Sequence, residues 1–221
     1  MDYALTANGA RIIETRTGKV LEEHLLSKEA AKKAIAIGRK YDTLLEVYFN
    51  GQGYAQKDEI AQVRKYHKNP NMWDYFLRTR IAVDRLEDLL DEKEGDLDKV
   101  QMLFADMEER EEAWKELERE GVFELVGSLQ YNIEINAVGV NKGTGLVNLG
   151  KMLGIRREEI MACGDGDNDI AMLKEVGFGV AMANAEEKVK AVADYITERN
   201  NDEGAAKAIE KFVLKRGGES C

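Results

Sequence analysis

The 221 residues allow one large domain or two small ones, and 44% hydrophobic residues is ordinary for a globular chain. The formal charge of −10 disfavours nucleic acid as a partner, because its phosphates would be repelled. No apolar run reaches the ~20 residues of a membrane span, polar residues interrupt any signal-peptide pattern at the start, and the two cysteines suggest no disulfide framework. We therefore expect a cytoplasmic protein that binds neither membrane nor nucleic acid.

The first part of the chain is predicted to mix half-polar strands with helices, as in an α+β module. In chain order we expect strands at 3–7, 11–14 and 19–26, a helix at 27–41, a strand at 45–49 that turns at Gly51 and Gly53, a helix from Leu86 to near Gly95, a strand at 100–104, a charged helix at 108–120, and strands at 122–126 and 131–136. In the strand at 45–49, Leu45, Val47 and Phe49 alternate with polar residues, which predicts a half-buried strand. The pattern between 58 and 80 is weak, with a loop expected at 67–71 and His67 at the surface.

After Val138 the pattern changes to that of an α/β module. Leu146, Leu149 and Leu153 predict a helix, and the nearly all-apolar segments 160–163 and 178–182 predict strands of a parallel sheet. A final helix is expected to dock through an apolar stripe formed by Ala205, Ala208, Ile209, Phe212 and Val213.

The most informative segment is the acidic turn, residues 164–169, which follows the predicted strand at 160–163. Asp165, Asp167 and Asp169 lie within five residues, with Asn168 between the last two. Such carboxylates repel one another unless a cation or a fixed ammonium lies among them. Ligands of open α/β sheets gather at the carboxyl ends of strands, so the turn predicts a functional site.

Two common motifs do not fit the sequence. An EF-hand loop that started at Asp165 would have Ile170 in place of the required glycine and Val176 in place of the bidentate glutamate. A phosphate-binding P-loop at residues 145–151 would have Met152 where a metal-binding serine or threonine is needed.

Four motifs together resemble the haloacid dehalogenase superfamily, specifically its Cof-type phosphatases. They are Asn8-Gly9-Ala10, the segment 140–143 (Val-Asn-Lys-Gly), the segment 164–173 around the acidic turn, and the segment 179–185 (Gly-Val-Ala-Met-Ala-Asn-Ala). The resemblance runs from Tyr3 to the end of the chain. It implies an α/β fold, in which residues 1–14 and 138–221 form a Rossmann-like core and residues 15–137 form an inserted α+β cap that selects the substrate.

The resemblance also implies a magnesium-dependent phosphatase of small phosphorylated metabolites such as sugar phosphates, which reacts through an aspartyl-phosphate. Asp165 is then the Mg²⁺ ligand. Lys142 neutralises the nucleophile and the phosphate, and Asp169 orients Lys142 or a metal-bound water. By the same resemblance Asn168 contacts the phosphoryl group or its neighbours.

Asn8 and Asn184 are weaker candidates for substrate binding. Each lies in one of the resembling motifs, but asparagine is also a common turn residue. Cys163 lies in an apolar strand, where a small buried side chain is expected more often than a nucleophile.

The family's nucleophile element, an apolar strand followed by Asp-x-Asp-Gly-Thr, does not occur in this sequence. Asp96-Leu97-Asp98-Lys99 has no preceding apolar strand and does not match it. We therefore expect a core without its first strands, as if about 70 residues preceded the chain, and no activity of these 221 residues alone. Two function classes remain: a phosphatase, or a non-catalytic remnant whose cap binds a ligand or a partner. We expect one of two outcomes for the open core sheet: either the strand at 3–7 moves into the vacated position beside 160–163, or two chains associate through the open sheet as a homodimer.

Overall fold

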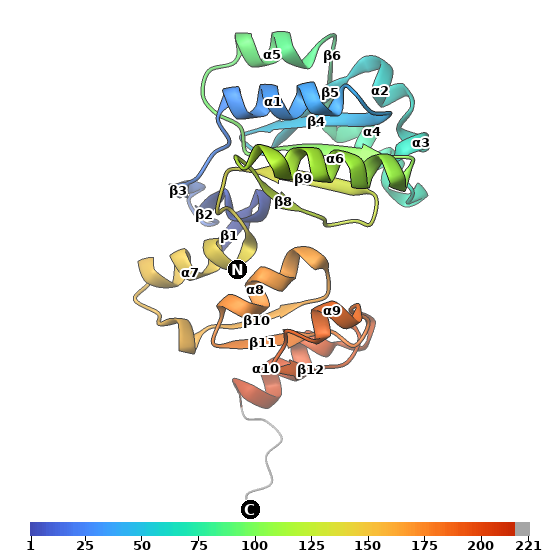
Figure 1. Cartoon of the computed structure of the whole chain (residues 1–221). Coiled ribbons are helices and arrows are strands. Elements are labelled where there is room, and N and C mark those ends of the chain that lie inside the picture. The colour runs from blue at the N-terminus through green and yellow to red at the C-terminus, as the bar shows by residue number, and fades with distance from the viewer. Residues whose placement is uncertain (215–221) are drawn as a thin grey trace, which may run out of the picture. The chain divides into compact units, whose positions relative to one another are not determined.

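The computed structural model describes residues 1–214 and has a mixed α/β fold (Figure 1). Its contacts group the chain into two compact units, Met1–Val140 and the residues from Asn141 onward. Within residues 1–214, no helix has both the length and the apolar character needed to cross a bilayer.

The first unit begins with a small antiparallel sheet in the order β1-β2-β3. Its strands are β1 (Tyr3–Thr6), β2 (Arg11–Glu14) and β3 (Lys19–Glu23), and the short helix η1 (Ala7–Gly9) joins the first two. The three strands predicted here are confirmed. The sequence-based division, which joins residues 1–14 to the second half of the chain, stays a prediction. Among residues 1–214, β1 pairs only with β2, and the Asn136 side chain donates to the Ala7 carbonyl at 2.9 Å.

The main sheet of the first unit has six strands in the order β6-β5-β4-β7-β9-β8. These are β4 (Thr43–Phe49), β5 (Gln52–Gln56), β6 (Arg80–Val83), β7 (Lys99–Phe104), β8 (Glu124–Val126) and β9 (Asn132–Asn136). One face packs against α1 (Lys28–Gly38), α5 (Leu86–Glu92) and α6 (Met107–Glu120), as Figure 1 shows. Leu45, Val47 and Phe49 point into this core, as their alternation predicts.

The opposite face of the six-stranded sheet is also covered, so β4 is buried on both sides rather than half-buried. Leu44 and Leu103 pack there against a second apolar cluster that includes Val63 and Phe76. Next to this cluster the face carries polar side chains, and even Glu46 is 0% exposed.

The second cluster comes from short helices that the weak sequence pattern did not predict. They are α2 (Lys57–Ala61), α3 (Val63–Tyr66), η2 (Pro70–Met72) and α4 (Trp73–Thr79). His67, expected at the surface, is buried between them and the sheet, with Nδ1 3.2 Å from the Tyr131 hydroxyl. Burial lowers the pKa of His67. Helices of one or two turns carry too few apolar positions to show a helical period.

The second unit has a parallel sheet in the order β10-β11-β12, formed by β10 (Met161–Gly164), β11 (Phe178–Ala181) and β12 (Tyr195–Ile196). Its helices are α7 (Lys142–Met152), η3 (Arg157–Glu159), η4 (Asp167–Asp169), α8 (Ile170–Glu175), α9 (Glu187–Lys190), η5 (Asn200–Asp202) and α10 (Gly204–Phe212). The predicted parallel pairing of the two apolar strands is confirmed. In the described part of the chain, β10 pairs only with β11, which leaves β10 at the edge of the sheet.

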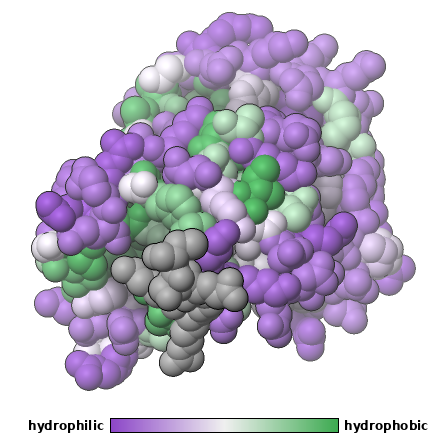
Figure 2. Space-filling view, turned by 90° about the horizontal axis from the view of Figure 1, so that it is seen from below, coloured by the Kyte–Doolittle hydropathy of each residue, from purple (hydrophilic) through white to green (hydrophobic). Residues whose placement is uncertain are grey.

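The helix expected at the end of the chain is present, but its apolar stripe is not fully docked. Ala208 is buried, whereas Ile209, Phe212 and Val213 are 43%, 36% and 57% exposed. Phe212 packs only in part, against Phe178 with ring centroids 4.7 Å apart. Figure 2, a view from below, shows hydrophobic residues in patches among hydrophilic ones. The stripe is thus partly open to solvent in this chain.

Candidate cation and phosphate site

The acidic turn lies at the carboxyl end of β10, between that strand and α8. Gly164 ends the strand, Asp165 and Gly166 follow in the loop, and η4 carries the remaining three polar residues into the helix. This is the strand-end position at which α/β sheets bind ligands.

Asp169 holds the turn together from within. Its side chain is buried, and Oδ2 accepts the backbone N–H groups of Asp165 at 2.9 Å and Gly166 at 3.0 Å. This arrangement requires glycine at position 164, because a Cβ there would lie 2.5 Å from the Asp169 Cβ. The carboxylate therefore fixes the backbone from which Asp165 projects.

Lys142 reaches the same carboxylate from the start of α7. Its Nζ donates to Asp169 Oδ1 at 2.6 Å, and the lysine side chain is 34% exposed. Asn141 caps the helix by accepting the N–H groups of Gly143 and Thr144, each at 3.0 Å. A Cβ on Gly143 would lie 2.7 Å from the Ala171 carbonyl oxygen, so this glycine lets α7 pack closely against α8.

Asp165 is exposed, and one of its carboxylate oxygens accepts a hydrogen bond from Asn184. The Asn184 amide Nδ2 donates to Asp165 Oδ2 at 3.0 Å, and its Oδ1 accepts the backbone N–H of Asn200 at 2.9 Å. Among the interactions of residues 1–214, none engages Asp165 Oδ1. That oxygen is available to a ligand.

The two remaining polar residues of the turn differ in their partners. Asp167 forms an ion pair with Lys188 of α9, and this hydrogen bond raises the pKa of Lys188. Within the described chain the Asn168 side chain has no hydrogen-bond partner, so its amide is open to a ligand. Lys188 could not be recognised from the sequence, since no pattern distinguishes a single lysine in a charged segment.

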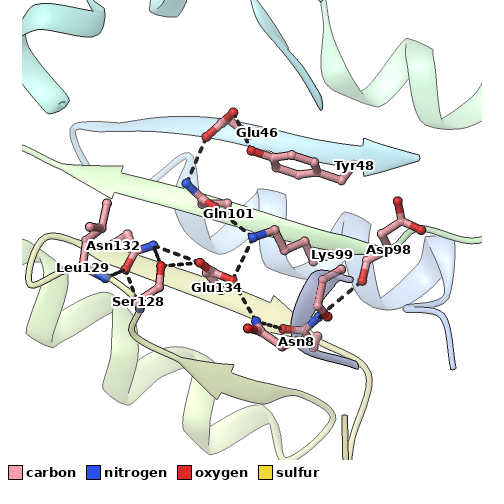
Figure 3. Close-up of polar contacts among 12 residues, drawn as sticks. Asn8, Glu46, Tyr48, Asp98, Lys99, Gln101, Ser128, Leu129, Asn132 and Glu134 are labelled. Atoms are coloured by element: carbon pink, nitrogen blue, oxygen red, sulfur yellow. Dashed lines mark hydrogen bonds and ion pairs between the residues drawn. The ribbon is translucent and has the colours of Figure 1, made fainter. Parts of the chain in front are cut away.

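Asn8 lies in the first unit and is 9% exposed. It takes part in a polar layer on the six-stranded sheet (Figure 3), donating to Glu134 Oε2 at 2.7 Å and to Asn136 Oδ1 at 2.9 Å. Its backbone is left-handed, with φ of 61°, a conformation that asparagine tolerates. The side-chain nitrogen of Asn8 is therefore engaged within its own unit.

The donors at the turn fit a largely hydrated Mg²⁺. No cluster of three or more acidic, histidine or cysteine side chains that could hold a metal occurs among residues 1–214. Mg²⁺, however, keeps several waters and commonly takes one or two carboxylates together with substrate phosphate. Asp165 Oδ1 would supply one such oxygen, whereas Asp167 and Asp169 are each engaged by a lysine. Burial raises the pKa of the nearby Cys163 thiol, which disfavours the thiolate needed for metal binding.

The chain is similar in sequence to proteins named as phosphatases. Over 105 residues the chain is 49% identical to 5-amino-6-(5-phospho-D-ribitylamino)uracil phosphatase YcsE of Bacillus subtilis strain 168, a match that covers 48% of this chain and 42% of YcsE. Over 88 residues it is 42% identical to a phosphoglycolate phosphatase of Methanosarcina acetivorans, covering 40% of this chain and 38% of that protein. In these matches the chain spans less than half the length of the curated relatives.

Similarity to a solved structure extends over nearly the whole chain. A haloacid dehalogenase-like hydrolase from B. subtilis superposes with a TM-score of 0.83 at 26% identity, covering 96% of this chain and 79% of that one. The model of the haloacid dehalogenase-like hydrolase family matches residues 1–209. The chain belongs to the haloacid dehalogenase-like hydrolase family.

Proposed function

We propose that this chain belongs to a Mg²⁺-dependent phosphatase of small phosphorylated metabolites, such as sugar phosphates, that reacts through an aspartyl-phosphate. The observation that carries the proposal is the acidic turn at the end of β10, where Asp165 offers a free carboxylate oxygen beside the Lys142–Asp169 pair. The phosphatases among its relatives support the same reaction class.

Three residues of the second unit would have different roles in binding the cation and the phosphoryl group. When bound, Mg²⁺ offsets negative charge on the phosphoryl oxygens, and Asp165 would hold it. Lys142, kept in place by Asp169, supplies a fixed ammonium at the start of α7. The free amide of Asn168 can donate to a phosphoryl oxygen.

The chain on its own is expected to be inactive, because no Asp-x-Asp-Gly-Thr element occurs in its sequence to supply the nucleophile. Loss of a covalent nucleophile costs on the order of 10⁶ in kcat. From a typical ~10 s⁻¹, about 10⁻⁵ s⁻¹ would remain. The assay is turnover of p-nitrophenyl phosphate by the purified chain with and without Mg²⁺. Turnover that needs Mg²⁺ and disappears in Asp165→Asn would contradict this expectation.

The experiment that tests the function extends the chain by the reading frame upstream of its Met1 codon. If that frame encodes an apolar strand ending in Asp-x-Asp-Gly-Thr, the extended protein should release phosphate from a panel of sugar phosphates and related metabolites in the presence of Mg²⁺. A stop codon directly upstream, or an extended protein without activity on the whole panel, would favour the second candidate. That candidate is a non-catalytic remnant whose first unit binds a ligand or a partner protein.

A further inference from the structure

Asn184 has both ends of its side-chain amide engaged within the second unit. Nδ2 donates to Asp165 Oδ2 at 3.0 Å and Oδ1 accepts the Asn200 N–H at 2.9 Å. A backbone N–H can only donate, so the Asn200 bond requires the amide oxygen at that position and turns the NH₂ group toward Asp165. The orientation of the amide therefore follows from its partners.

Backbone hydrogen bonds connect the loop that carries Asn184 to the segment of Asp165 and to the segment of Asn200. Met182 N donates to the carbonyl of Gly164, the residue before Asp165, at 3.0 Å. Ala183 N donates to the carbonyl of Glu198, two residues before Asn200, at 3.3 Å. The side chain thus spans two segments that are already fixed relative to it.

From this arrangement we propose that Asn184 is a positioning residue for the Asp165 carboxylate, and that the backbone N–H of Asn200 sets the orientation of its amide. Holding Oδ2 leaves Oδ1 as the oxygen presented to a cation. A direct bond from Asn184 to substrate would require breaking one of its two present bonds, which makes a positioning role the better assignment. The inference rests on the proposed cation site at Asp165.

Three variants separate this role from a structural one. Asn184→Ala removes the donor to Asp165, and loss of such a supporting bond typically weakens metal binding 10- to 100-fold. Asn200→Pro removes the N–H that orients Asn184, together with the bond from the Asn201 N–H to the Asn200 side chain. Proline is tolerated there, since position 200 begins η5 and Arg199 has the extended φ and ψ of −64° and 157° that precede proline well.

Asn200→Ala is the matched control. It keeps the backbone N–H and loses only the side-chain bond in which Asn200 Oδ1 accepts the N–H of Asn201. Each variant is compared with the unaltered chain for thermal stability, so that a change in Mg²⁺ affinity at unchanged melting temperature can be recognised.

The measurement is an NMR titration of the full chain with Mg²⁺, following the backbone amide signals of Asp165 and Gly166. We expect the dissociation constant to rise about 10-fold in Asn184→Ala, to rise less in Asn200→Pro, and to stay unchanged in Asn200→Ala. Equal affinity of Asn184→Ala and the unaltered chain would overturn the inference and leave the cation site standing. Absence of any Mg²⁺ effect in the unaltered chain would overturn both. Equal effects of the two Asn200 variants would overturn the role of its N–H.

Discussion

Asp165, Asp167 and Asp169 are equivalent in the sequence and differ sharply in the structure. Asp169 is buried and paired with Lys142, Asp167 forms an exposed ion pair with Lys188, and Asp165 keeps a free oxygen. The spacing of the three carboxylates was enough to locate the site. Their separate partners are Asn184 for Asp165, Lys188 for Asp167 and Lys142 for Asp169. These partners lie elsewhere in the chain, so spacing alone could not assign them.

These differences predict an order of sensitivity in an active, extended form of the protein. Asp165→Ala should lower kcat/KM by on the order of 10³ or more, since it removes the cation ligand. Lys142→Ala should cost about 10² to 10³ through lost charge stabilisation. Asp167→Ala should cost less than about 10-fold, because an exposed ion pair contributes little. Steady-state kinetics at saturating Mg²⁺ measure the order, and a ranking with Asp167 as the most sensitive position would refute it.

At the scale of elements, β7 and β9 carry a layer of polar side chains that the sequence pattern did not predict. Lys99 Nζ donates to Glu134 Oε2 at 2.7 Å, and Gln101 Nε2 donates to Glu46 Oε2 at 3.1 Å (Figure 3). Burial acts to raise the pKa of Glu134, but the Lys99 ammonium and the hydrogen bonds from Lys99, Ser128 and Asn8 outweigh it, so the pKa lies below its ordinary value.

The layer predicts a specific pH dependence of stability. A carboxyl group with a folded-state pKa below its unfolded value of about 4.3 stabilises the fold above that pH and loses this contribution as pH falls through the folded pKa. Glu134→Gln should therefore lower the free energy of unfolding by about 3 kcal/mol at pH 7, and by less near pH 3. Urea denaturation at both pH values measures it, with the exposed Glu118→Gln as control. If Glu134→Gln lowers the free energy of unfolding equally at both pH values, the predicted contribution of the ionised Glu134 is wrong.

Most strands and long helices of the fold follow from their apolar periods, including the hairpin of β4 and β5 and the parallel pair β10 and β11. The helices within residues 57–79 could not be predicted in this way, because each is too short to show a helical period of apolar residues. The burial of Glu46 did not follow either, since alternation with polar residues normally marks a face open to solvent. Only tertiary contacts decide such features.

At the scale of the whole molecule, the free edge of β10 is the feature with the clearest expected consequence. Ile160 and Met161 line two open grooves, one toward Leu149 of α7 and one toward Phe212 of α10. The Phe178 and Met182 N–H groups bond to the carbonyls of Ile160 and Gly164, so the intervening Met161 and Cys163 have backbone groups on the free edge. An edge with unpaired backbone groups and apolar flanks favours pairing with another strand.

We propose that two copies of this chain associate along β10. Size-exclusion chromatography with light scattering should give twice the monomer mass, and Met161→Lys should shift the equilibrium to monomer by placing a charge on the apolar edge. Ile196→Lys is the matched control, because it lies on β12 at the opposite edge of the same sheet and is 48% exposed. A monomer at every concentration, or equal effects of the two lysines, would contradict the proposal.

The grouping of contacts also bears on how the protein is made. Each compact unit is a single uninterrupted stretch, and all six strands of the large sheet lie before Val140. Domains fold as units during synthesis, at about 5 to 20 residues per second. The strands of the first unit are therefore synthesised before β10, β11 and β12 of the second unit. The apolar core of the first unit can close before the grooves beside β10 exist, so the nascent chain need never expose both apolar surfaces at once.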